Sequence, residues 1–451
     1  MKNKNALRAM NAIDDKYLEE AESIRKPAGF GYKKPLIAFL CTILLVVGIT
    51  VFPQRKKSVM NPVAFAIEPN MENTKNYNFS DYADIARNIT KMDAEALKVL
   101  ADQDGKNVLY SPLNIYLATG MLAEISGTTT QREVLDFLGF SNLQELEDQI
   151  YILWNDLNTG NPENKLVLSL ANSVWLNQDK EINKDPLQRL ADYQFASSYA
   201  GQMGSEEMNQ KIRDWINDKT NGLLKDAAKD IKLKEDTVMA LISALYMKDS
   251  WRDVFDANIN TVEVFHAPSG DVETEMMHSG ETGSIFIGTK FTAFQKMMSG
   301  TSMLFVLPKE GYTVNDLADD EEVRQLLEDP YAIPQKFGII HLSVPKFDVT
   351  GKLNLRDILE KMGLAEMFGS EADFTPLIST GAYVSKATHD CRIKVDETGV
   401  EGAAYTMYVV ADGMMADPDE YWLTLDRPFL YSVSTFGGVH LFTGILQNPA
   451  E

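Results

Sequence analysis

Hydrophobic residues recur at helical spacing in the first part of the chain after residue 80. Between Asp81 and Ala101, the apolar residues Ile85, Ile89 and Leu100 fall near one face of a helix. Ser111-Pro112 supplies an N-cap and an early proline for a helix that runs to Leu122. Further helices are predicted at Thr129–Leu138, at Asn142–Leu157, and at Asn354–Met362, which Gly363 closes.

Strand patterns dominate the later part of the chain. Val238–Met247 is a long apolar run that suits a strand covered on both faces. The C-terminal sequence predicts two strands joined at Gly437-Gly438. The other predicted strands are Asn107–Tyr110, Thr261–His266, Met303–Leu307 and Ile340–Phe347. Helices first and mostly antiparallel strands last predict the α+β class.

One apolar run differs from the rest because basic residues flank it on both sides. Residues 36–52 carry no charge, and lysines or arginines stand directly before and after them. At about 1.5 Å per residue, a helix of this length would be about 26 Å long, slightly short of a bilayer core. A buried core helix is the alternative, but the charge clusters favour a transmembrane helix.

The basic residues also predict an orientation. Residues 1–34 hold eight lysines and arginines, against three just after the run, which predicts a cytoplasmic N-terminus. We therefore expect a cytoplasmic segment 1–35, a single-pass anchor 36–52, a linker 53–80 and an extracellular domain 81–451 in the cell membrane. The alternative is secretion after cleavage at the A-x-A site at residues 64–66.

Composition narrows the possible chemistry. The chain has 451 residues and a formal net charge of -22, so binding to nucleic acid is not expected. Two cysteines and five scattered histidines predict neither a disulfide scaffold nor a metal site, and no cofactor is expected. The hydrolase motif GxSxG and any paired-carboxylate motif are missing, so we expect that the protein is not an enzyme.

The segment from Val395 to Asp426 contains no lysine or arginine in 32 residues. It is rich in small residues, then β-prone, then acidic, and long loops of this kind in compact domains are usually functional or disordered. If Val400–Tyr408 became a strand, Val400, Gly402, Ala404 and Thr406 would share one small, uncharged face. An ordinary edge strand followed by a surface loop is the simpler alternative.

Five stretches of the sequence resemble the serpin family. DETGVEGAAYT, within 396–406, is similar to the hinge of the serpin reactive loop. The others, in the family's order, are NVLYSPLNIYLATGMLAEISGTTTQREVLDFLGF (107–140), SALYMKDSWRDVF (243–255), HLSVPKFDVTGKLNLRDILEKMGLAEMF (341–368) and DRPFLYSV…HLFTGILQNP (426–449). The resemblance spans residues 81–451.

The resemblance implies a serpin fold: N-terminal helices, a large central mixed β-sheet, further sheets and an exposed reactive-centre loop at about 397–422. It also implies suicide inhibition of a serine protease, or of a cysteine protease, by a monomer in a 1:1 covalent complex. The protease cuts the loop and stays bound as an acyl-enzyme while the upstream arm inserts as a new central strand. A non-inhibitory serpin that acts as a scaffold or binding protein is the alternative.

The resemblance assigns roles to individual residues. The hinge residues that it implies are Glu397, Gly399, Val400, Gly402, Ala403, Ala404 and Thr406. Gly399 would permit unusual backbone angles, and Gly402 stands where alanine is usual, which would weaken insertion. In the region where the sheet must open, the implied cluster is Ser111, Asn114, Ser243, His389 and Trp251. Asn114 and Ser243 exchange the family's usual residue types, so we hypothesise that they form one hydrogen-bond network with His389; independent drift of the two positions is the alternative.

The scissile residue is expected near the far end of the loop. Counting from Glu397 at the family's spacing gives Gly413, and counting back from Pro428 gives Met414 or Met415, of which Met414 is favoured. An apolar residue and the lack of basic ones predict an elastase-, chymotrypsin- or subtilisin-like target, not a trypsin-like one. The stretch 141–165, which corresponds to a heparin-binding region in some serpins, holds five acidic residues and one lysine, so heparin is not expected to bind.

Overall fold

Two β-sheets and the helices packed on them form the part of the chain that the structure describes. The structure is a computed structural model, and it describes residues 41–51, 66–67, 79–101, 105–158, 166–222, 224–399 and 419–451. The α-helices are α2 (Phe79–Leu100), α3 (Pro112–Ile125), α4 (Thr128–Leu138), α5 (Leu143–Leu157), α6 (Asp185–Gln194), α7 (Glu206–Lys219), α8 (Lys225–Ala228), α9 (Val314–Ala318), α10 (Glu321–Glu328) and α11 (Leu355–Lys361). Short 3₁₀ turns lie at Ala257–Ile259, Pro330–Ala332 and Glu366–Phe368.

The central sheet contains seven strands within the described residues. Their order across the sheet is β12 (Phe347–Asn354), β13 (Ala382–Val395), β1 (Cys41–Val51), β6 (Thr237–Lys248), β4 (Val167–Asn177), β5 (Ala196–Gly201) and β2 (Ala66–Ile67). Only β4 and β5 of these described strands pair in parallel, so the sheet is mixed. β2 adds a strand within the expected linker 53–80.

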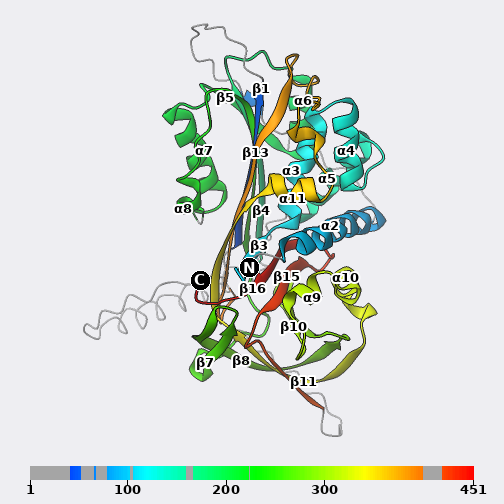
Figure 1. The fold of residues 1–451 in the computed structure, drawn as a ribbon, viewed down its shortest axis with the longest axis vertical. Coiled ribbons are helices and arrows are strands. Elements are labelled where there is room, and N and C mark those ends of the chain that lie inside the picture. The colour runs from blue at the N-terminus through cyan, green and yellow to red at the C-terminus, as the bar shows by residue number, and fades with distance from the viewer. Residues whose placement is uncertain are drawn as a thin grey trace, which may run out of the picture. The chain divides into compact units, whose positions relative to one another are not determined.

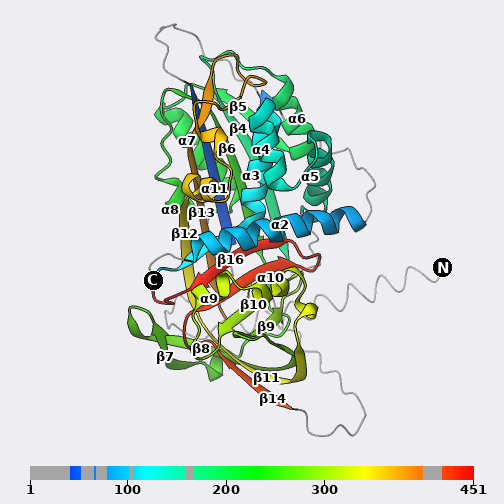
Figure 2. The ribbon, with the colours of Figure 1, turned by 45° about the vertical axis from the view of Figure 1, so that its right-hand side comes forward.

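The second sheet contains nine strands within the described residues. Among the described strands its order is β14 (Glu420–Thr424), β11 (Gln335–Pro345), β8 (Gly270–Ile287), β9 (Phe291–Met297), β10 (Thr301–Pro308), β15 (Phe429–Thr435), β16 (His440–Leu446) and β3 (Val108–Tyr110), with β7 (Thr261–Ala267) paired to β8. Figure 2 shows α9 and α10 beside this sheet.

Helices cover both faces of the central sheet. Figure 1 shows α3, α4 and α5 on one side of it and α7 and α8 on the other. On the α7 side, Ile212 and Ile216 pack with Trp175 and Ile242 of the sheet in a separate apolar cluster. Because the sheet is covered twice, eleven of the twelve positions of β6 are buried, as its apolar run predicted.

The local patterns gave most of the predicted elements with small shifts of their ends. Ser111 caps α3, and its side chain accepts a hydrogen bond from the backbone of Asn114. Gly363 follows α11 with a φ of 95°. The strand predicted at Ile340–Phe347 is two strands, because the chain passes from the second sheet to the central sheet between Pro345 and Phe347.

The prediction of a transmembrane helix at 36–52 is wrong. Residues Cys41–Val51 form β1, which pairs antiparallel with β13 on one side and β6 on the other. Seven of these eleven residues are Thr, Val or Ile, the β-branched types that favour strands. A strand between two neighbours in a covered sheet is apolar throughout, as a membrane helix is, so the composition alone does not separate the two.

The predicted location in a cell membrane is also wrong, because it depended on that helix. None of the helices in the described ranges is both long enough and apolar enough to cross a bilayer. The single-pass anchoring and the assignment of sides to the two ends of the chain depended on a helix at 36–52, and they are withdrawn with it.

Candidate functional site

The chain leaves the central sheet at the end of β13 through a tight turn, which we call the hinge segment, Asp396–Gly399. The carboxylate of Asp396 accepts hydrogen bonds from the backbone of Thr398 at 3.0 Å and from its hydroxyl at 2.9 Å. Burial raises the pKa of Asp396 above its ordinary value, and the Thr398 bonds act against that rise. The turn directs the chain away from the sheet, and the chain next enters a described element at β14 in the second sheet.

Gly399 occupies a place that only glycine fits without a shift. Its φ is 70°, in the left-handed region that other residues rarely adopt. A Cβ atom at this position would lie 2.4 Å from the backbone nitrogen of Trp251 and 2.8 Å from the Cα of Ser250. Both contacts are to backbone, so a larger residue would have to displace one of the two chains.

Trp251 holds the hinge segment from the other side. Its indole Nε1 donates to the carbonyl of Asp396 at 2.8 Å, and its backbone N–H donates to the carbonyl of Thr398 at 3.3 Å. The ring is buried and packs edge-on against Phe255, whose backbone N–H donates to the carbonyl of Glu397 at 3.0 Å. The structure therefore brings the predicted residues Trp251, Glu397 and Gly399 together.

Glu397 is tied to the crossing point between the two sheets. Lys346, which stands between β11 and β12, pairs with Glu397 at 2.7 Å and with Glu275 at 3.0 Å. The amide of Asn260 also donates to Glu397, at 2.6 Å. Burial lowers the pKa of Lys346, but its bonds to the two glutamates outweigh burial and raise the pKa above the ordinary value. The carboxylate of Glu397, two residues after the end of β13, is therefore held in place by Lys346 and Asn260.

The remaining predicted loop residues lie outside the described residues. These are the hinge residues Val400, Gly402, Ala403, Ala404 and Thr406, and the scissile candidates Gly413, Met414 and Met415. Their roles stay predictions.

The predicted sheet-opening cluster is only partly connected. The backbone N–H of Ser111 donates to Nε2 of His389 at 2.9 Å, and the Ser111 hydroxyl accepts from the backbone of Asn114 at 3.1 Å. Burial lowers the pKa of His389 to about 3, so its ring is neutral. Within the described part of the chain, the carboxamide of Asn114, the hydroxyl of Ser243 and Nδ1 of His389 are buried without a hydrogen-bond partner.

The position of β1 explains why the side chains of Ser243 and His389 do not meet. Leu45 of β1 stands opposite Ser243 of β6 and also opposite His389 of β13. Neighbouring strands lie about 4.8 Å apart, so one intervening strand separates β6 from β13 by about 10 Å. A buried polar group without a partner costs about 1–3 kcal/mol. The predicted hydrogen-bond network of Asn114, Ser243 and His389 is therefore not formed in the described part of the structure.

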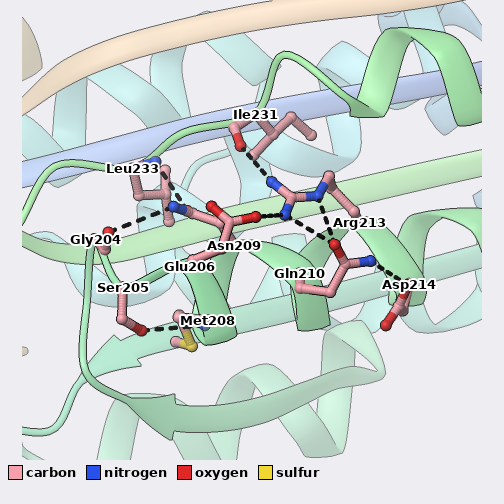
Figure 3. Close-up of polar contacts among 10 residues, drawn as sticks. All are labelled: Gly204, Ser205, Glu206, Met208, Asn209, Gln210, Arg213, Asp214, Ile231 and Leu233. Carbon is pink, nitrogen blue, oxygen red and sulfur yellow. Dashed lines mark hydrogen bonds and ion pairs between the residues drawn. The ribbon is translucent and has the colours of Figure 1, made fainter.

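Helix α7 covers the outer face of the same sheet, and polar contacts fix the segment that follows it (Figure 3). The side chain of Asn209 accepts from the backbone of Leu233 at 3.1 Å, and Arg213 donates to the carbonyl of Ile231 at 3.3 Å. Arg213 also pairs with Glu206 at the start of the helix. Helix α7 is therefore fixed by these contacts above β4 and β6.

The sequence had not indicated several of the residues that hold the hinge. Lys346 lies in the PKF motif quoted above, but nothing in the motif pairs it with Glu397. Asn260 carried no signal, and Asp396, although it begins the quoted hinge motif, was given no role. As for ions, no group of three or more His, Cys, Asp or Glu residues in the described ranges is placed to hold a metal.

Comparisons with known proteins agree with this architecture. Residues 87–449 match the family described as Serpin (serine protease inhibitor). The chain is 28% identical to Neuroserpin of Mus musculus, over 77% of this chain and 87% of that protein. Among solved structures, it is similar to the thermophilic serpin Tengpin in its native state, with a TM-score of 0.71, 23% identity, and coverage of 85% of this chain and 97% of that chain.

A third likeness is to human Thyroxine-binding globulin, solved with its ligand bound. The TM-score is 0.70, with 22% identity and coverage of 83% of this chain and 100% of that chain. At these identities the two solved structures show a shared fold alone. They confirm the predicted α+β fold, with helices and a large mixed sheet.

Proposed function

Because the chain belongs to the serpin family of serine protease inhibitors, we propose that it traps its target protease as a covalent acyl-enzyme. The protease first cuts the segment after Gly399 as a substrate, and the part upstream of the cut then becomes a strand of the central sheet. One observation carries this proposal: β13 ends in a hinge whose glycine has a left-handed φ of 70° and is wedged against the backbone of Ser250 and Trp251. A chain held in this way can unfold locally at one residue and turn back along β13.

The covalent step uses the chemistry of the protease. Its serine Oγ attacks the carbonyl carbon of the scissile bond, the C–N bond breaks, and the leaving amine takes the proton that the protease's histidine had accepted. The upstream part of the loop remains esterified to the serine. Water would normally hydrolyse this ester with the help of the oxyanion hole, so a distorted oxyanion hole stalls the reaction. In this reaction the protein is a substrate of the protease and not itself an enzyme.

The energy for the distortion comes from the new strand. From Val400 to Met414, the arm would be about 50 Å long at about 3.3 Å per residue. Insertion would therefore carry an attached protease from the hinge end of the sheet to its far end. Each ladder hydrogen bond contributes about 0.5–1.5 kcal/mol net, and a central strand makes them along both edges.

The charge of the loop supports the choice of target. No Lys or Arg stands between Val395 and Asp426, and Met414 is the favoured scissile residue. An elastase-, chymotrypsin- or subtilisin-like protease has an apolar pocket that accepts methionine, whereas a trypsin-like pocket needs a cation.

A protease panel tests the proposal. The purified protein is mixed with elastase, chymotrypsin, subtilisin and trypsin, and the products are separated in SDS. We expect a complex that survives SDS with one of the first three proteases, and N-terminal sequencing of the released C-terminal fragment should give the cut site at residues 413–415. A complex with trypsin alone would overturn the assignment of the target class.

A non-inhibitory role is the second candidate. Thyroxine-binding globulin, which is named for a ligand and not for a protease, has a similar fold. A cavity of about 490 Å³ in this chain, lined by Gln295, Leu304, Leu327 and Ser432 among others, has room for a small molecule. Loop cleavage by every protease in the panel, with no complex and no gain in thermal stability, would favour this candidate.

A further inference from the structure

Strand β1 occupies the position in the central sheet that the proposed function reserves for the cleaved loop. We define the acceptor position as the space between β13 and β6, and Cys41–Val51 fill it with pairing on both edges. We propose that this N-terminal strand is an internal competitor, which must leave the acceptor position before the loop can insert. The inference rests on the proposed function and adds a regulatory step to it.

The two strands would have the same direction. β1 runs antiparallel to β13 and to β6. A chain that leaves β13 at Val395 and turns back at Gly399 would also run antiparallel to β13. Both strands would form hydrogen bonds with the same backbone N–H and C=O groups of β13 and β6. Each of these edges can pair with one strand at a time. Occupation by one therefore excludes the other.

The register shows where displacement would begin. The described part of β1 starts opposite Arg392 and Met247, and it ends opposite Ala382 at the far end of β13. The last three residues of β13 lie beyond that start, next to the hinge segment. The incoming loop would meet the N-terminal end of β1 first and release it pair by pair toward Val51.

The lining of the acceptor position indicates that β1 is not its best occupant. Ser243 and His389 are the register partners of Leu45 on its two sides, and the hydroxyl of Ser243, Nδ1 of His389 and the carboxamide of Asn114 are buried without hydrogen-bond partners. The pairing of β1 is also irregular at one end, with register shifts at Gly48/Ile49 toward β13 and at Ile49/Thr50 toward β6. A strand held in this way can be exchanged for another.

A reversible lock tests the competition in the full-length protein. Val46 stands directly opposite Thr388, at a separation that suits a disulfide between antiparallel strands. The test protein carries Val46→Cys and Thr388→Cys in a Cys41→Ala background. Its matched control carries Val47→Cys in place of Val46→Cys, because Val47 is the register partner of Ala387 and not of Thr388.

Each protein is oxidised, checked for the cross-link by peptide mass, and mixed with a subtilisin-type protease, which has no disulfides of its own. We expect the cross-link only in the test protein, loss of its SDS-stable complex while oxidised, and recovery of the complex after reduction. Failure of the cross-link to form would overturn the place of β1. A locked protein that traps as well as its reduced form would overturn the competition.

The outcomes separate this inference from the proposed function. If neither protein traps the subtilisin-type protease in either redox state, and the unmodified protein forms no SDS-stable complex with elastase or chymotrypsin either, inhibition by trapping is wrong. The inference is then judged by the cross-link and by the melting temperature after loop cleavage, which should rise in the reduced test protein and not in the locked one. If the control traps normally and the test protein does so in both states, the proposed function stands and the competition fails.

Discussion

Replacing Gly399 by alanine should destabilise the intact protein and leave the loop-cleaved protein almost unchanged. In the intact protein the new Cβ would lie 2.4 Å from the nitrogen of Trp251, at a φ of 70°. The left-handed conformation costs about 1–2 kcal/mol for a residue with a Cβ, and overpacking against fixed atoms costs about 1–3 kcal/mol. The expected loss is therefore about 2–5 kcal/mol.

The cleaved protein differs because residue 399 would have left the turn. If the upstream arm becomes a strand, Gly399 adopts extended angles that alanine tolerates, and its Cβ no longer meets Trp251. The assay is urea unfolding of both forms of the wild type and the variant, followed by tryptophan fluorescence. Equal destabilisation of the intact and cleaved variants would refute the claim that the hinge changes conformation.

Gly363→Ala is the matched control for this experiment. Gly363 also has a positive φ, of 95°, but no atom lies within 4 Å of the position that a Cβ would take. It follows α11, away from the hinge segment, so alanine should cost about 1–2 kcal/mol in both forms alike. A difference between the forms that appears in this control as well would mean that cleavage changes the whole molecule and not the hinge.

Three further predictions follow from the same region. Lys346→Met leaves the carboxylates of Glu397 and Glu275 without their cation, so urea unfolding should show a loss of about 1–3 kcal/mol in the intact protein. Burial lowers the pKa of His389 to about 3 from an ordinary value of 6.5, so between these values the unfolded chain binds a proton that the folded chain does not bind. The free energy of unfolding should therefore fall as the pH falls from about 6.5 toward 3, by up to about 1.4 kcal/mol per pH unit. His389→Gln should remove this part of the slope when unfolding is measured as a function of pH. Val46→Pro removes a ladder donor from β1, so the rate of complex formation in stopped-time SDS assays should rise, and an unchanged or lower rate would count against the competition by β1.

Local patterns were enough for the elements with a clear period. The apolar stripe of α2, the N-cap at Ser111 and the closing Gly363 are signals contained within a few residues, and each marks an element of the structure. Gly399 has the positive φ that its place in the motif indicated. These features depend on short-range sterics and capping, which a sequence displays directly.

Apolar runs without a period were ambiguous. Val238–Met247 and residues 36–52 have the same character, and the first was correctly predicted as the covered strand β6. The basic residues that flank residues 36–52 led to the prediction of a membrane helix for that run. In the structure, Cys41–Val51 form a strand that pairs with β6 in the same sheet. Whether such a run is a strand depends on its partners, and those lie about two hundred residues or more further along the chain.

The contacts that hold the hinge could not be predicted for a similar reason. The amide of Asn260 and the carboxylate of Glu397 are 137 residues apart in the sequence, and Lys346 meets Glu397 only because β11 and β12 belong to different sheets. The separation of Ser243 from His389 depends on which strand lies between β6 and β13, which the two residues themselves do not encode.

Amide hydrogen exchange on the loop-cleaved protein tests the central claim most directly. Peptides that cover residues 400–412 and 41–51 are followed by mass spectrometry before and after cleavage with the trapping protease. We expect that, on cleavage, residues 400–412 become as protected as β13 while residues 41–51 lose their protection. Fast exchange of residues 400–412 in the cleaved protein, with residues 41–51 still protected, would contradict it.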